Sequence, residues 1–181
     1  MPIKIAVLKE TKPGEKRVSM VPSVVQRLER LGASAVFERG AGTAATFDDG
    51  AYSHASFAET PEALVADADI VLAVQPPPAV VAGTMKAGAV LISFVYGQAN
   101  RELVATLRDK KITAFAMELV PRISRAQSMD ALSSQAALAG YYAPLLGAVH
   151  MPRILPMMTT AVGSLRAAKV LVMGQGVAGL S

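Results

Sequence analysis

The stretch DIVLAV at residues 69–74 is the part of the sequence that decides the fold. A short run that is almost entirely apolar is typical of a strand buried on both faces, as the strands of parallel sheets are. QPPP follows at residues 75–78, and its three prolines must end the strand because proline has no backbone N–H to donate. The stretch therefore predicts an internal strand of a parallel sheet.

Runs of the same kind recur on either side of DIVLAV, and helical patterns separate them. We expect further strands at residues 3–8, 34–38, 89–95 and 112–117. We expect helices at residues 22–33, 61–66 and 100–111. The first helix has Pro22 in its first turn and Gly32 at its end, which are the positions that these residues favour. The alternation predicts an α/β fold with a doubly wound parallel sheet.

The pattern changes after the last of these strands. Residues 126–149 are rich in Ala and Leu and predict one long helix, which Pro144 should kink or split. KVLVM at residues 169–173 predicts another buried strand. We therefore expect three parts. These are an N-terminal α/β domain at residues 1–125, a connecting helical segment at residues 126–165, and the first strand and glycine turn of a second, truncated domain at residues 166–181.

GQGVAG at residues 174–179 follows the last expected strand and has the spacing of a dinucleotide-binding turn. In such a turn the first glycine permits a tight bend, the second lets the backbone approach a pyrophosphate, and the third allows close packing. The residues that would bind the cofactor are Gly174, Gln175, Gly176, Val177 and Gly179. A complete unit takes about thirty residues, but only seven follow Gly174. We therefore expect the start of an NAD-binding Rossmann domain in the N-terminal part of a larger protein, although the motif alone also fits an ordinary glycine turn.

The composition narrows the class of protein. With 52% hydrophobic and 18% charged residues, the chain of 181 residues is an ordered globular protein rather than a disordered one. The net charge is +4, but the basic residues are not interleaved with stacking aromatic residues, so we expect no nucleic-acid partner. No apolar run approaches membrane-spanning length, so we expect no direct membrane insertion. The chain has no cysteine, and no metal site is expected.

The segment ELVPRISRAQSMDALSSQ at residues 118–135 carries the densest group of polar side chains. It follows the last strand of the expected sheet, and open parallel sheets bind ligands beyond the carboxyl ends of their strands. Spacing alone favours a structural role, because Ser124 and Gln127 have the S-x-x-Q spacing of a capping box and Asp130 would suit the positive end of a helix. A ligand-binding loop is the other interpretation.

Within that segment, PRISRAQSMDALSSQ resembles the nicotinamide-facing loop of the NAD(H)-binding component of proton-translocating NAD(P) transhydrogenase. KETKPGEKRVSMVPSVV, ERGAGTAATFDDGAY, FVYGQANRELV and KVLVMGQGVAGL are also similar to the transhydrogenase and alanine dehydrogenase superfamily. The resemblance covers essentially the whole chain but corresponds to the first half of such a subunit.

The resemblance implies direct hydride transfer between NAD(H), bound here, and NADP(H), held by a partner domain. No side chain need act as acid, base or nucleophile, so catalysis consists of positioning the two nicotinamide rings. Arg122, Gln127, Asp130 and Ser133 match the loop residues that bind the cofactor, and Gln127 and Asp130 would position the hydride.

The resemblance also implies partners. These are NADP(H)-binding and membrane-spanning subunits that couple hydride transfer to proton translocation, and a second copy of the chain in a homodimer. Such a protein is cytoplasmic and peripheral to the inner (plasma) membrane through its partner subunits. We expect residues 1–181 alone to bind NAD(H) weakly and to be inactive.

Two other functions stay open. An alanine-dehydrogenase-like oxidoreductase has a Lys after the third expected strand and a His after the fourth, where this chain has Gln75 and Gly97, although Arg17 is kept. A non-catalytic assembly module is the second alternative. The chain also departs from the transhydrogenase pattern at Tyr142, where an Arg is usual, and at Gln175, which is larger than the residue expected between the first two glycines.

Overall fold

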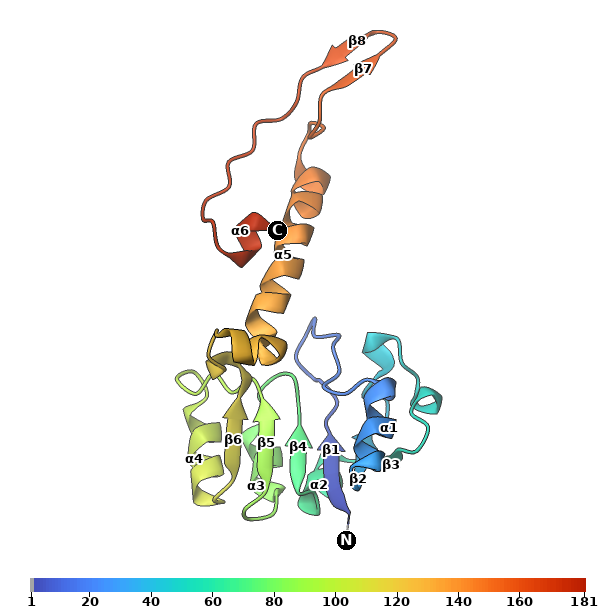
Figure 1. The fold of residues 1–181 in the computed structure, drawn as a ribbon, viewed down its shortest axis with the longest axis vertical. Helices are drawn as coiled ribbons and strands as arrows, with labels where there is room; N and C mark the ends of the chain where they lie inside the picture. Colours follow the sequence, from blue (N-terminus) through green and yellow to red (C-terminus); the bar gives the residue numbers. More distant parts are fainter. Residues whose placement is uncertain (1) are drawn as a thin grey trace. The chain divides into compact units, whose positions relative to one another are not determined.

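The computed structural model describes residues 2–181. Its backbone divides into two compact units, which we call unit 1 (up to Val120) and unit 2 (Pro121–Ser181). Figure 1 shows the elements of each unit along the chain. The finer division at residues 125 and 165 stays a prediction.

Unit 1 is built on a six-stranded parallel sheet in the order β3-β2-β1-β4-β5-β6. The strands are β1 (Ile3–Val7), β2 (Ala33–Glu38), β3 (Ser56–Ala58), β4 (Ile70–Leu72), β5 (Val90–Ser93) and β6 (Thr113–Ala116). The helices are α1 (Pro22–Arg30), α2 (Pro61–Ala66), α3 (Ala79–Thr84) and α4 (Arg101–Asp109), with short 3-10 turns η1 (Thr43–Ala45), η2 (Asp49–Ala51) and η3 (Met117–Leu119). The doubly wound parallel sheet predicted from the sequence is confirmed.

Two elements of unit 1 are absent from the sequence prediction. Strand β3 has three residues at the edge of the sheet and none of them is fully buried, so it lacks an apolar run. Helix α3 begins directly after Pro78, and its Val80-Val81 pair favours a strand by intrinsic preference. Packing decides α3, because its Val81 and Ala82 are buried in the core, and pairing with β2 defines β3.

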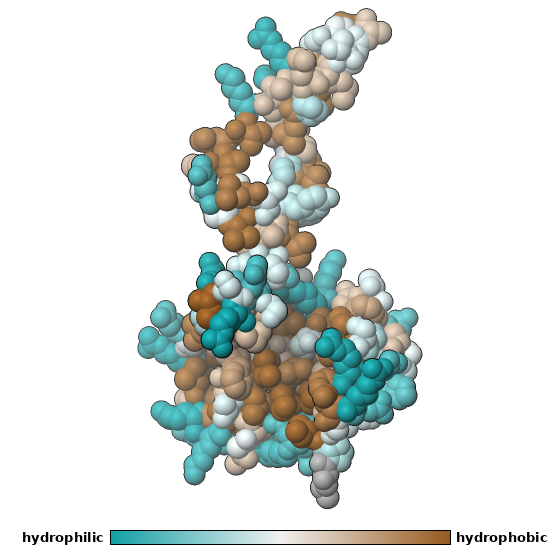
Figure 2. All heavy atoms as spheres, viewed as in Figure 1, coloured by the Kyte–Doolittle hydropathy of each residue, from teal (hydrophilic) through white to brown (hydrophobic). Residues whose placement is uncertain are grey.

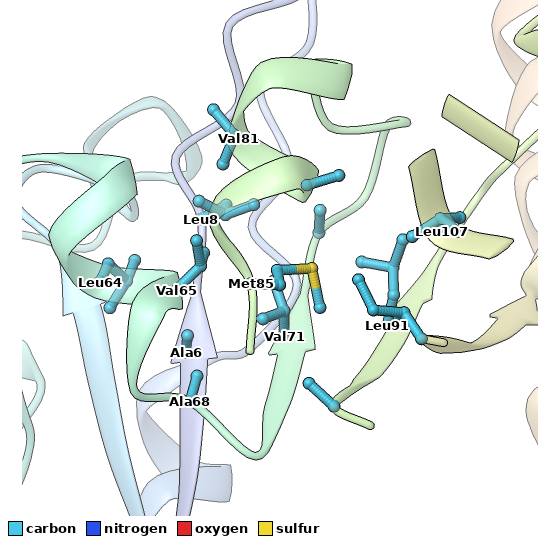
Figure 3. Packing of buried hydrophobic residues seen from close by; sticks show 14 of the residues in the cluster. Ala6, Leu8, Leu64, Val65, Ala68, Val71, Val81, Met85, Leu91 and Leu107 are labelled. Carbon is cyan, nitrogen blue, oxygen red and sulfur yellow. The ribbon is translucent and has the colours of Figure 1, made fainter. Parts of the chain in front are cut away.

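Alternating strand residues feed two separate cores. Ala6 and Leu8 point toward α2, α3 and α4, whereas Ile5 and Val7 pack with Val25 of α1. Figure 3 shows the first core, in which Met85 and Leu91 pack beside Val71 of β4. Fully burying a side chain such as Leu91 stabilises the fold by about 1.5–3 kcal/mol.

The face of the sheet opposite α3 and α4 is covered only in part. On this face Val90 and Ile92 of β5 are half-buried, and Phe115 of β6 is 58% exposed. Figure 2 shows hydrophobic side chains gathered over the middle of unit 1 in this view. Unit 1 therefore retains apolar surface on one side of its sheet.

Unit 2 contains the 3-10 segment η4 (Ser124–Met129), the long helix α5 (Ala131–His150), a hairpin of β7 (Met158–Thr160) and β8 (Gly163–Leu165), and the short helix α6 (Val177–Leu180). The predicted long helix is present, but it begins at Ala131 rather than at residue 126. Pro144 does not split it: α5 is continuous through this residue. The residue whose carbonyl faces the proline ring is Gly140, four positions earlier.

Two local predictions for unit 2 are wrong. The α-helix is not capped by a box of Ser124 and Gln127, which lie inside η4; Asp130 is its N-cap. Residues 169–173 form no strand. A strand needs a hydrogen-bonded neighbour, and the only strands that the structure describes in unit 2 pair with each other.

Candidate functional site

The polar loop before α5 brings two of its four predicted binding residues into contact. Asp130 is the N-cap of α5, and its Oδ1 accepts the backbone N–H of Ser133 at 2.9 Å. Hydrogen bonds from the Ser133 side chain and backbone lower the pKa of Asp130, and the charge of Arg122 adds to this effect. Gln127 is exposed in η4, and its backbone carbonyl accepts the N–H of Asp130 at 3.3 Å. The loop thus holds the Asp130 carboxylate at the start of α5 and leaves the Gln127 side chain exposed.

The glycines of the turn at residues 174–179 have the three properties that a dinucleotide turn requires. Gly174 has a φ of +105°, which side chains rarely tolerate. A Cβ on Gly176 would meet nothing within 4 Å, so the backbone is open to an approaching group. A Cβ on Gly179 would overlap the carbonyl of Gly174, so the turn closes tightly on itself. The strand that should precede the turn is not formed.

The glycine turn packs against the middle of α5. A side chain on Gly140 would overlap the carbonyl of Ala178, so these two backbones are in close contact. Asp130 lies ten residues before Gly140, which corresponds to about 15 Å along the helix axis. The predicted binding residues therefore form two groups at separate levels of α5.

Unit 1 contains a second candidate site that the sequence did not reveal. A cleft of about 670 Å³ opens at the carboxyl ends of β1 and β4. These strands lie where the chain order in the sheet reverses, because β2 is on one side of β1 and β4 is on the other. Open α/β sheets bind ligands at this position. The cleft is found only when the strand order is known.

Three glutamates hold the carboxyl edge of the sheet together. Glu10, after β1, accepts the N–H groups of Val74 and Gln75 at 2.6 and 3.0 Å. Glu118, after β6, accepts the N–H groups of Val95 and Tyr96 at 3.0 and 2.6 Å. Glu38, the last residue of β2, accepts the N–H of Lys9 at 2.9 Å. These carboxylates bind backbone N–H groups, so each connects neighbouring segments at this edge of the sheet.

The positions that distinguish a dehydrogenase lie beside this cleft. Gln75 lies after β4 and Gly97 after β5, in the places expected from the sequence. Glu15 accepts two hydrogen bonds from the Arg17 guanidinium, at 2.7 and 2.6 Å, and one from the Gln75 amide at 2.7 Å. The bonds from Arg17 lower the pKa of Glu15 to about 2. Arg17 is thus already paired with a carboxylate of the chain.

The titratable groups do not assemble an acid–base site within the described residues. His54 lies 3.5 Å from Glu29 on the surface, and His150 is the last residue of α5; neither lines the cleft. Across residues 2–181, no three His, Asp or Glu side chains gather closely enough to hold a metal ion. No helix in the same range combines the length and apolar character needed to cross a membrane.

Comparison with known proteins gives the same fold. Residues 6–139 match the family described as "Alanine dehydrogenase/PNT, N-terminal domain", and residues 143–181 match its C-terminal domain. The crystal structure of transhydrogenase from Sinorhizobium meliloti superposes with a TM-score of 0.91 at 42% identity, covering 98% of this chain and 53% of that one. An L-alanine dehydrogenase structure gives 0.81 at 26% identity and covers 98% of this chain and 50% of that one.

Curated relatives rank in the same way. An NAD(P) transhydrogenase alpha subunit of Rhodospirillum rubrum is 48% identical over 98% of this chain. Alanine dehydrogenase of Mycobacterium tuberculosis is 30% identical over the same share. The chain spans about half of the length of either relative, 48% in both cases. It belongs to the alanine dehydrogenase/PNT family, and its greater similarity is to transhydrogenase alpha subunits.

Proposed function

We propose that this chain forms the N-terminal part of the NAD(H)-binding component of an NAD(P) transhydrogenase. Hydride would pass from NADH on this component to NADP⁺ on a partner subunit, or from NADPH to NAD⁺ in the reverse direction. Membrane-spanning partners couple that transfer to proton translocation and hold the component at the membrane surface. The observation that carries the proposal is the polar loop before α5 together with the glycine turn packed on the same helix.

The loop residues would position the nicotinamide end of the cofactor. Bound NAD(H) supplies the hydride chemistry itself. Asp130 accepts the backbone N–H of Ser133 through Oδ1, and its carboxylate would also accept a carboxamide N–H or a ribose hydroxyl. Gln127 is exposed and carries both a donor and an acceptor. Arg122 offers five N–H donors for a carbonyl or anionic group. The turn from Gly174 to Gly179 would receive the pyrophosphate.

The absence of acid–base chemistry separates this proposal from a dehydrogenase. Oxidation of an amino acid needs a proton acceptor near the substrate carbon and a free cation for the carboxylate. Two glutamates of the cleft, Glu10 and Glu38, accept backbone N–H groups, and Arg17 is bound to Glu15. Transfer of hydride between two nicotinamide rings requires neither group, only positioning within about 3–3.5 Å.

A chimeric subunit tests the proposal. Residues 1–181 would replace the matching half of the Rhodospirillum rubrum alpha subunit, and hydride transfer from NADH to an NADP⁺ analogue would be followed by absorbance with that organism's partner subunits. We expect transfer that depends on the NADP⁺ analogue. Reduction of NAD⁺ by alanine without any second nucleotide would overturn the proposal.

The isolated chain gives a second prediction. Residues 1–181 should bind NADH weakly, because the strand before the glycine turn is not formed and its residues are exposed. Isothermal titration calorimetry with NADH measures this directly. A dissociation constant in the micromolar range would show that the turn needs no supporting sheet.

A further inference from the structure

Methionine supplies all the sulfur of the chain, which has nine methionines and no cysteine. Met20 and Met85 are buried in unit 1, at 4% and 1% exposure. The large exposed methionines among the described residues all lie in unit 2 and are Met129, Met157, Met158 and Met173. A peroxide must reach the sulfur atom to oxidise it, so these thioethers are the most accessible targets for oxidation.

Met129 is the exposed methionine that lies within the polar loop before α5. It is the last residue of η4, it precedes the N-cap Asp130, and it is 54% exposed. The N–H of Asp130 donates to the Gln127 carbonyl at 3.3 Å, which is long for such a bond. The N–H of Ser133 donates to Asp130 Oδ1 at 2.9 Å. A chemical change at Met129 therefore occurs directly beside the contacts that hold the Asp130 carboxylate.

Oxidation replaces the apolar thioether of methionine with a polar sulfoxide. An electron pair of the sulfur attacks one oxygen of hydrogen peroxide, the O–O bond breaks, and the other oxygen leaves as water, so thioether and peroxide give sulfoxide and water. The sulfoxide oxygen is a hydrogen-bond acceptor far stronger than the thioether. Next to the cap of α5, it competes with the Asp130 carboxylate for the N–H groups that the first turn of a helix leaves without partners.

We propose that Met129 is a reversible oxidation site whose sulfoxide loosens the Asp130 cap and thereby controls the cofactor loop. The thioether form leaves the Asp130 carboxylate on the N–H of Ser133, and the sulfoxide form competes for that N–H. Reduction by a dithiol, catalysed by methionine sulfoxide reductase, returns the thioether and yields a disulfide and water. The effect on hydride transfer rests on the proposed function, whereas the oxidation and the loosening of the cap do not.

The test begins with mild oxidation of the 181-residue chain by hydrogen peroxide, followed by peptide mass spectrometry. Met129 should gain oxygen well before Met20 and Met85. Amide hydrogen exchange at Ser133 should then accelerate about fivefold, as expected for loss of an N-cap, and should recover after treatment with methionine sulfoxide reductase and dithiothreitol. Oxidation of Met129 no faster than that of Met85, or an unchanged exchange rate at Ser133 once Met129 is oxidised, would overturn the proposal.

Two variants assign the response to one sulfur atom. Met129→Leu keeps the size and apolar character of the side chain and removes the sulfur, so peroxide should no longer accelerate exchange at Ser133. Met158→Leu is the matched control, because Met158 is 47% exposed but lies in strand β7. The response at Ser133 should persist in this control. A response that survives in Met129→Leu, or that disappears in both variants, would refute the assignment to Met129.

The chimeric subunit connects the oxidation site to hydride transfer. Peroxide should slow transfer about tenfold in the unchanged chimera and much less in Met129→Leu, since small displacements of positioning groups are costly. Methionines outside residues 1–181 are the same in both proteins and do not affect this difference. Equal slowing in both would refute control of the cofactor loop. A chimera without any transfer before oxidation would instead contradict the proposed function, and exchange at Ser133 would still decide whether Met129 is an oxidation site that loosens the cap.

Discussion

Glu15 is the carboxylate whose ionisation should contribute most clearly to the stability of unit 1. Its bonds to Arg17 lower its pKa from 4.5 to about 2 in the folded protein. A lowered folded pKa means that the stabilisation is fully present above the ordinary pKa and is lost as the pH falls from about 4.5 toward 2. Because Arg17 is partly exposed, we expect about 2 kcal/mol at neutral pH rather than the full value of the shift.

Urea unfolding followed by circular dichroism would measure this contribution. Glu15→Gln should unfold at lower urea than the unchanged chain at pH 7, and the difference should narrow below pH 4.5 and close as the pH approaches 2. Other carboxylates titrate in both proteins, so their contributions to the free energy of unfolding cancel in the difference. A gap that stays constant with pH would show that the charge of Glu15 is not involved.

Asp130 combines a structural role with its proposed binding role. Its side chain caps α5 through the N–H of Ser133, so Asp130→Ala should destabilise the helix by about 1 kcal/mol as well as remove a ligand group. Asp130→Asn keeps the cap and removes only the charge. In the chimeric subunit, Asn should preserve helix content and still slow hydride transfer. Unchanged turnover in Asp130→Asn, measured at saturating NADH, would remove the charge from the mechanism.

At the scale of elements, the contact between α5 and α6 depends on a single glycine. Gly140→Ala favours helix formation in α5 by about 1 kcal/mol but places a methyl group against the Ala178 carbonyl. We expect circular dichroism to show equal or greater helicity, whereas amide hydrogen exchange in residues 174–180 accelerates. Gly147→Ala is the matched control, because a Cβ there meets nothing within 4 Å. Equal rates of amide exchange in both variants would show that the glycine turn does not pack against α5.

The elements of unit 1 were predictable to different degrees. Apolar runs such as DIVLAV specify buried strands by themselves, and β1, β2, β4, β5 and β6 lie where such runs predict them. The order of the strands cannot be predicted from any single apolar run, because the pairing of β1 with β4 joins residues more than sixty positions apart. The switch-point cleft and its glutamates were therefore outside the reach of local patterns.

The spacing of residues in the binding loop also predicted its structure only in part. Spacing alone favoured capping, and a cap is present, but its residue is Asp130 rather than Ser124. The S-x-x-Q pattern was misleading because Ser124 and Gln127 lie within one 3-10 segment that ends before the α-helix begins. Binding roles for Arg122, Gln127, Asp130 and Ser133 came from family resemblance, since no property of their side chains or spacing distinguishes nicotinamide from another polar ligand.

At the scale of the whole molecule, the two units differ in how much apolar surface they expose. In unit 1 the core residues are covered by helices on at least one face of the sheet. In unit 2, α5 exposes six large apolar or aromatic residues, Leu138, Tyr141, Tyr142, Leu145, Leu146 and Val149, and the segment Val170, Leu171, Val172 and Met173 is more than 60% exposed throughout. Figure 2 shows hydrophobic side chains along α5 and along the segment after the hairpin.

Surface of this kind favours association, so the isolated chain should self-associate through unit 2. Sedimentation velocity over a hundredfold concentration range should show a rising mean mass. Val170→Lys together with Val172→Lys should suppress that rise, because charged side chains prevent unpaired segments from pairing with one another. Lysines at Val80 and Val104, two exposed positions on the helices of unit 1, control for the added charge. If the control pair suppressed association equally, net charge rather than the exposed segment of unit 2 would govern it.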